Sequence, residues 1–392
     1  MPRLTAGGIV ALLLLAGMPA RGGAADPAGP PSSALMHQCR PGPWGEMEYS
    51  RIVIEPPDDF IPANYVAPPS RWNFPGFTPA QLEQLGRDAG LDDAQRQALQ
   101  DPAIMDRTAE GLALRPGDEL VRSLSAESRA RLYNTLARLP GNPLQTEPFR
   151  FRAEIMDEWF KDCDLPAPIV AAVRSLCYRR GSALAFSDLG LVLPQIPAAA
   201  DRARLLKTLA RKSTLLLKVR IGPGSDIDTI AEYWGNGRRR KDVKPLLQSL
   251  SRHPGGMPID VVHLLPRFAR ALLYTYPDPD APAEMARDCH WTSMNFFNDP
   301  PEARFADIAY LKDILIKTYA PVRGAPTMGD LLMLTRADGE VIHSCIYLGD
   351  DIVFSKNGQS ASVPWTLTTI QDLQAFYPED PPLQVRMFRL KQ

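Results

Sequence analysis

The sequence lacks the features of a membrane-spanning or nucleic-acid-binding protein. No stretch reaches the 18 or so uninterrupted apolar residues that a transmembrane helix needs. No charge of one sign dominates, since 44 Lys and Arg stand against 45 Asp and Glu, for a formal net charge of −1. The one dense basic cluster, at residues 238–241, lies in a Gly- and Asn-rich turn and is typical of a solvated loop. We therefore expect no transmembrane span and no nucleic-acid partner.

The first 25 residues predict a secretory signal peptide. Arg3 gives a short positive start, residues 9–16 form an apolar run, and small residues continue through Ala24 and Ala25. The first cysteine is Cys39, so no lipid-anchored amino terminus is indicated. We expect a periplasmic or extracellular protein that is soluble once the signal is removed.

Cysteine is sparse, with five residues in the chain. In an exported protein an odd number leaves one thiol unpaired if the others form disulfides, and a free thiol is compatible with a nucleophile. Cys163 and Cys177 are the closest pair in the sequence and could close a short loop. Spacing alone leaves this disulfide open.

The pattern divides the chain after the signal into three parts. Residues 26–75 are rich in Pro and Gly, with a strand-like run at 51–55, and form a lead-in. Residues 76–282 are expected to be mostly helical and of unknown role, with a helix at 79–88 after the capping residue Thr78 and a β-rich run at 214–221. Residues 283–392 form a separate α+β domain.

Within this last domain, Cys289 is predicted to begin a helix. Trp291, Met294 and Phe297 recur at helical spacing after the capping residue Asp288. The unpaired amides and the dipole of a helix start favour a thiolate, and the same amides can hold an oxyanion. Cys289 is therefore the candidate nucleophile.

Three antiparallel strands are predicted after the helix, at residues 330–335, 340–348 and 352–355. His343 lies in the middle strand, where alternation places His343, Cys345 and Tyr347 on one face and Ser344 on the other. If the His343 face packs on the helix, this imidazole can reach the thiol and act as its base.

These elements resemble the NlpC-type cysteine peptidases of bacterial cell-wall metabolism, whose fold is a reduced form of papain. Asp288-Cys289 matches their nucleophile, residues 328–332 (MGDLL) match their Gly-Asp-Leu strand, and residues 343–349 (HSCIYLG) match their catalytic-histidine strand. The match covers about a quarter of the chain. It implies an α+β fold in which an α-rich amino-terminal region precedes a small papain-like domain.

Two positions depart from the family pattern. His290 and Trp291 stand where Ser-Gly usually follows the nucleophile, which would crowd the cleft. The third catalytic position, counted from His343, falls at Ser355, with Lys356 and Asn357 adjoining it. Ser355 or Asn357 could accept the imidazole proton, as Asn does in papain-like enzymes.

Simpler interpretations compete for the neighbouring residues. Cys345 lies in mid-strand and is typical of a small core residue, whereas Asp288 and Asp330 are explained as helix and turn caps. Tyr274 and Tyr276 precede the nucleophile much as an oxyanion-assisting tyrosine does in the family, and are otherwise core aromatics. The alternative of a zinc site would use four side chains, Cys289, His290, His343 and Cys345.

The sequence thus predicts a secreted Cys–His hydrolase that cleaves amide bonds and needs no metal or organic cofactor. The resemblance implies peptidoglycan stem peptides as substrate. One alternative is an acyltransferase or lipid hydrolase on the same fold. The other is a non-catalytic envelope protein, in which the helical region binds a partner.

Overall fold

The structure is a computed structural model that describes residues 36–61, 65–108, 110–181, 183–236, 239–278, 287–377, 379 and 381–391. The predicted signal peptide, residues 1–25, lies outside the described residues. Helices contain 40% of the residues and strands contain 24%, and the strands form several antiparallel sheets. The expected α+β class is therefore confirmed. No helix among the described residues is long and apolar enough to cross a membrane.

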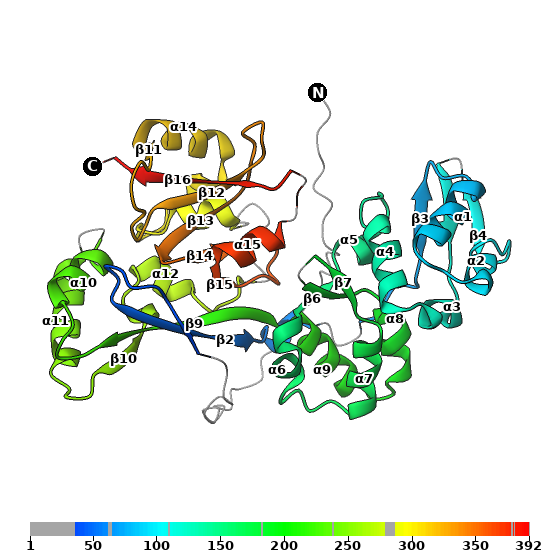
Figure 1. The fold of residues 1–392 in the computed structure, drawn as a ribbon, viewed down its shortest axis with the longest axis horizontal. Helices are drawn as coiled ribbons and strands as arrows, with labels where there is room; N and C mark the ends of the chain where they lie inside the picture. The colour runs from blue at the N-terminus through cyan, green and yellow to red at the C-terminus, as the bar shows by residue number, and fades with distance from the viewer. Residues whose placement is uncertain are drawn as a thin grey trace. The chain divides into compact units, whose positions relative to one another are not determined.

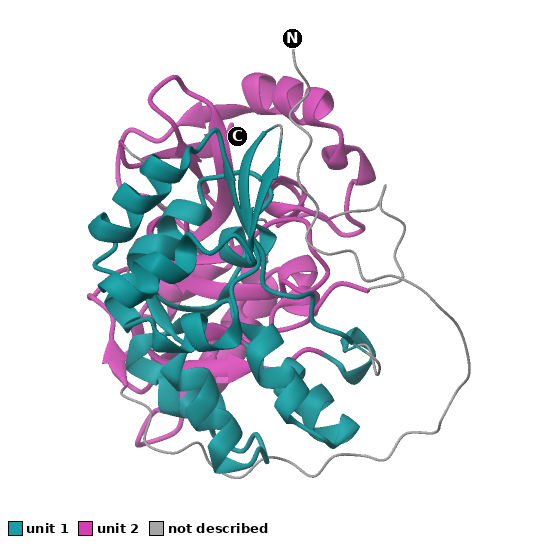
Figure 2. Cartoon of the chain, turned by 90° about the vertical axis from the view of Figure 1, so that its right-hand side faces the viewer, with its two compact units in different colours: residues 1–19, 57–211 teal, residues 20–56, 212–392 magenta. Residues whose placement is uncertain are grey.

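The described chain forms two compact units (Figure 2). Unit 1 contains residues 57–211, and unit 2 contains residues 36–56 and 212–391. The expected boundary between 282 and 283 therefore falls inside unit 2. The strand-like run expected at 51–55 also belongs to unit 2, where it is the end of a longer strand, β2 (Glu46–Ile54).

Unit 1 combines short helices with two three-stranded antiparallel sheets. Helix α1 begins after Thr78, whose side chain caps it together with Gln81, and it spans the predicted range. The region expected to be mostly helical also contains strands that are only three or four residues long. The helices are α1 (Pro79–Asp88), α2 (Asp93–Leu99), α3 (Asp118–Ser123), α4 (Ala126–Leu136), α5 (Pro143–Thr146), α6 (Met156–Phe160), α7 (Ala167–Ser175), α8 (Leu189–Val192) and α9 (Ala199–Ala210). The sheets have the orders β3 (Trp72–Pro75), β5 (Gly111–Leu114), β4 (Met105–Thr108) and β6 (Phe149–Arg152), β8 (Ala183–Phe186), β7 (Tyr178–Arg180).

Unit 2 contains a four-stranded and a six-stranded sheet, both antiparallel (Figure 1). The first has the order β1 (His37–Gln38), β2, β9 (Lys212–Ile221), β10 (Met257–Asp260). The second has the order β11 (Tyr319–Pro321), β16 (Gln384–Leu390), β12 (Leu331–Thr335), β13 (Val341–Gly349), β14 (Ile352–Lys356), β15 (Trp365–Thr369). The three predicted strands are the centre of this larger sheet.

One hydrophobic core joins the two sheets of unit 2. Leu217 of β9, Phe354 of β14 and Trp365 of β15 are all buried in it. Thr214 Oγ1 also exchanges hydrogen bonds with the backbone of Leu367, at 3.0 and 3.2 Å. The helices of this unit are α10 (Ile227–Trp234), α11 (Arg240–Ser251), α12 (Arg267–Leu272), α13 (Cys289–Met294), α14 (Ile308–Thr318) and α15 (Ile370–Phe376).

A buried carboxylate fixes the turn that leads into β12. Asp330 accepts a hydrogen bond from the Thr327 amide at 2.8 Å, which confirms the expected turn role. Its two oxygens also accept from Nε and Nη2 of Arg389 on β16, at 2.7 Å each. The Asp330 side chain is 1% exposed and that of Arg389 is 44% exposed. The pair therefore ties the carboxy-terminal strand to the centre of the sheet.

We expect Arg389→Ala to lower the free energy of unfolding of unit 2 by about 2 kcal/mol, because it leaves the Asp330 carboxylate buried without its counter-charge. Arg386→Ala, at an exposed position of the same strand, should change it by less than about 0.5 kcal/mol. Urea denaturation, with hydrogen exchange of the β12 and β16 amides to assign the transition, measures both. Equal effects of the two variants would contradict the role given to this pair.

Candidate functional site

Cys289 is the first residue of α13, as the sequence predicts. Asp288 caps the helix by accepting a hydrogen bond from the Trp291 amide at 2.7 Å, which confirms its capping role. The Cys289 residue is only 6% exposed. The candidate nucleophile is thus at a helix start, but largely buried.

The helix packs on the opposite face of β13 from the one proposed. Met294 and Phe296 share a core with Ile346 and Phe354. Cys345 instead belongs to a small cluster with Leu373 of α15. The hypothesis that the face of β13 with His343 and Cys345 packs on the Cys289 helix is therefore wrong. Helix α15, which is not among the elements expected from the sequence, packs on that face.

The sulfur of Cys289 nevertheless meets β13 beside His343. Pairing between β13 and β14 ends at Ile346 and Phe354, so the strands are unpaired at residues 343–345. Burial and the Asp288 charge raise the pKa of the Cys289 thiol to about 12, while amide hydrogen bonds from Ser344, Cys289 and His290 lower it. Burial dominates, and the resting thiol is protonated.

His343 is held at both ring nitrogens. Nε2 lies 2.9 Å from Ser355 Oγ, and Ser355 donates its hydroxyl proton to Asn357 Oδ1 at 2.8 Å. Because Ser355 has only one proton to give, it accepts from the Nε2–H of His343. Nδ1 therefore carries the lone pair, and it accepts a hydrogen bond from the Tyr377 hydroxyl at 3.0 Å.

The imidazole is fully buried and uncharged. The His343 residue is 0% exposed. Burial, with a smaller contribution from His290, lowers the pKa of His343 to about 3. A neutral imidazole with its Nδ1 lone pair available is the form that acts as a general base.

The structure therefore joins three of the four predicted site residues into one chain, His343–Ser355–Asn357. Cys289 reaches the neighbouring Ser344, but no hydrogen bond within the described chain connects its thiol to His343. Ser355 and Asn357 are the two candidates for the third catalytic position. Ser355 contacts the His343 ring directly, and Asn357 contacts Ser355.

A second polar cluster lies on the α13 face of β13. His290 Nδ1 is 2.8 Å from Ser344 Oγ, which is 3.0 Å from Ser293 Oγ. Ser293 donates to the Cys289 carbonyl oxygen at 2.6 Å. His290, which departs from the family pattern, therefore anchors the start of α13 to β13.

The other candidates take up simpler positions. All five cysteines are free thiols, so no bond joins Cys163 to Cys177. Tyr274 and Tyr276 donate to backbone carbonyl oxygens of β9 and β2, at 2.7 and 3.3 Å. Within the described ranges, no three His, Cys, Asp or Glu side chains are grouped so as to hold a metal ion.

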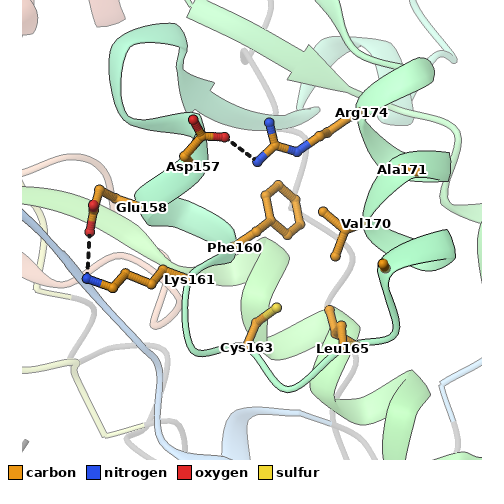
Figure 3. A pocket seen from close by; sticks show the side chains of 10 residues that line it. Asp157, Glu158, Phe160, Lys161, Cys163, Leu165, Val170, Ala171 and Arg174 are labelled. Atoms are coloured by element: carbon orange, nitrogen blue, oxygen red, sulfur yellow. Dashed lines mark hydrogen bonds and ion pairs between the residues drawn. The ribbon is translucent and has the colours of Figure 1, made fainter. Parts of the chain in front are cut away.

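Unit 1 has a pocket at its surface (Figure 3). Its apolar part includes Phe160, Leu165 and Val170, and ion pairs Asp157–Arg174 (2.7 Å) and Glu158–Lys161 (3.7 Å) lie beside it. None of the predicted site residues lines it.

Two side chains at the site were missed as participants. Tyr377 follows α15, 34 positions after His343, and no local pattern marks it. Lys356 adjoins Ser355 in the sequence and is fully buried at the end of β14, which is unusual for lysine. The available signal is a lysine at the end of a strand that begins with three apolar residues, Ile352, Val353 and Phe354.

Comparison with known protein families, with curated proteins and with solved structures finds no match to this chain.

The geometry predicts that His343 stays uncharged, with the proton on Nε2, between about pH 5 and pH 8. The reason is its burial, which holds the pKa near 3. ¹⁵N NMR of the histidine rings measures both the tautomer and its titration. Ser355→Ala should weaken the preference for Nε2–H, and Tyr377→Phe should shift the Nδ1 resonance while keeping that tautomer. Protonation of the ring above pH 5 would contradict this assignment.

Proposed function

We propose that unit 2 carries a cysteine-dependent amide hydrolase similar to the NlpC-type peptidases, with Cys289 as nucleophile and His343 as base. The main support is the chain His343–Ser355–Asn357, which orients a neutral imidazole on the strand that Cys289 contacts. This is the arrangement that a papain-like site requires of its base.

The reaction begins with proton transfer from the Cys289 thiol to Nδ1 of His343. The thiolate attacks the carbonyl carbon of an amide, and the amides at the start of α13 stabilise the oxyanion. The C–N bond then breaks as the imidazolium returns its proton to the leaving amine. Water hydrolyses the remaining thioester and releases the free thiol.

The resting structure has to change before the first step. Nδ1 is occupied by the Tyr377 hydroxyl, and the Cys289 thiol is buried. The thiol contacts the Ser344 amide on the α13 face of β13, whereas His343 contacts Ser355 and Tyr377 on the other face. The proposed step therefore also requires the thiol and the imidazole to be brought together where β13 is unpaired with β14. Rotation of the Tyr377 side chain frees the base.

The resemblance of residues 283–392 supports peptidoglycan stem peptides as the substrate class. The signal-like amino terminus supports a periplasmic or extracellular site of action, where such a substrate is found. Lipid esters are the alternative acyl donors on the same chemistry.

A non-catalytic envelope binding protein is the second candidate function. It is favoured by the burial that raises the pKa of the Cys289 thiol to about 12, since an unreactive thiol suits a structural residue.

Hydrolysis of purified muropeptides by the full chain tests the proposal. Cys289→Ala should lower kcat/KM by on the order of 10⁴ or more, because it removes the attacking atom. Cys345→Ala is the matched control, since it removes a buried thiol from the α15 face and should retain activity. A lipid ester assayed in parallel separates the two acyl classes. Absence of Cys289-dependent hydrolysis of either substrate would favour the binding protein.

A further inference from the structure

Lys356 is a fully buried lysine at the end of β14, where its side chain is 0% exposed. Its ammonium group donates to the carbonyl oxygens of Gly358 at 2.7 Å and Ser360 at 3.1 Å. Both acceptors are neutral, and removal of an ammonium group from water costs free energy that neutral carbonyl groups return only in part. A methionine would fill a similar space without this cost. Packing alone therefore does not explain a lysine at this position.

The side chain reaches these carbonyl groups from the α13 face of the sheet. Strand alternation puts Lys356 on the same face as Phe354, which is buried in the core that α13 shares. The Lys356 nitrogen is 5.7 Å from the centre of the Trp365 ring, within the range of a cation–π contact. Trp365 in turn donates to Thr292 Oγ1 of α13 at 3.0 Å. The core thus holds the lysine on one side while its ammonium group holds the turn on the other.

The turn that follows β14 folds back on Lys356 through both backbone groups of Gly358. The Gly358 amide donates to the carbonyl oxygen of Lys356 at 3.2 Å, and the Gly358 carbonyl accepts from the ammonium group. Gly358 has a φ of +95°, a conformation that favours glycine. Asn357 lies between these two residues, so its backbone is fixed from both sides.

The position of Asn357 determines which ring nitrogen of His343 carries the proton. Ser355 donates its hydroxyl proton to Asn357 Oδ1 at 2.8 Å, which leaves its oxygen to accept from Nε2 of His343 at 2.9 Å. If Asn357 moves away, the Ser355 hydroxyl can donate to Nε2 instead, and the ring proton then belongs on Nδ1. The Nδ1 lone pair, which the proposed base uses, therefore depends on Asn357.

We propose that Lys356 is a positioning residue for the base: its ammonium group fastens the turn that holds Asn357, and Asn357 acts through Ser355 to keep the His343 proton on Nε2. The proposal rests on the proposed function only in taking His343 as the base. Lys356 exchanges no proton in this role, and each step from Lys356 to His343 is a hydrogen bond.

The test is the ratio of the two His343 tautomers, measured by ¹⁵N NMR of the histidine rings in the full chain. Lys356→Met should lower the ratio of Nε2–H to Nδ1–H by roughly two- to tenfold, the range that one ordinary hydrogen bond supplies. The free energy of unfolding should not fall, because an apolar side chain replaces a buried charge. An unchanged ratio in folded Lys356→Met protein would overturn the proposal, whether or not the chain hydrolyses muropeptides.

A double variant shows whether the lysine acts through Asn357. Asn357→Ala alone should lower the tautomer ratio by a similar factor, because it removes the acceptor of the Ser355 proton. Addition of Lys356→Met to Asn357→Ala should then change the ratio little, since residues that act through one contact are not additive. Two independent, additive effects would show that Lys356 acts by another route, and the proposal would fail.

A second variant disturbs the turn without altering the lysine. Gly358→Ala places a side chain at a φ of +95°, which alanine disfavours, and the added methyl group meets no described atom within 4 Å. It should lower the tautomer ratio in the same direction as Lys356→Met. If Lys356→Met does not fold, an unchanged ratio in Gly358→Ala overturns the proposal.

Lys317→Met is the matched control in both experiments. It removes a lysine whose side chain is 67% exposed and should leave the tautomer ratio unchanged. A change in the ratio equal to that of Lys356→Met would show a general effect of charge and would contradict the role given to Lys356.

Discussion

The candidate site depends on the separation of β13 from β14 beyond the Ile346–Phe354 pair. Backbone groups that leave a sheet ladder inside a protein need other partners. The start of α13 meets this need on one face, where the Ser344 amide acts on the Cys289 sulfur. On the other face, a hydrogen bond between the side chains of His343 and Ser355 links the two strands. The thiol and the imidazole therefore contact this segment of β13 from opposite faces.

Burial determines the protonation states within this gap. Removal from water disfavours every charged form, so the thiol of Cys289 and the imidazole of His343 are both neutral at rest. Lys356 is the exception, because two carbonyl oxygens and an indole ring face its ammonium group.

The two sheets of unit 2 form one structural support for the site. Trp365 illustrates the connection, because it is buried in the common core, bonds to Thr292 of α13 and lies beside the Lys356 ammonium. Strands β2 and β9 contribute to the same core. A strand from the supposed lead-in is thus part of the domain that contains Cys289. The isolated carboxy-terminal domain expected from the sequence is, in the structure, part of this larger unit.

The sequence by itself determined the local features: the helix start at Cys289 with its Asp288 cap, the strand containing His343, and the turn at Asp330. Each follows from short-range periodicity and capping, which act within a few residues. Only the tertiary structure decided which face of β13 receives α13, that the Tyr377 hydroxyl donates a hydrogen bond to Nδ1 of His343, and that Lys356 is buried at the end of β14. Alternation specifies that a strand has two faces, but the elements that cover each face come from distant parts of the chain and are selected by packing.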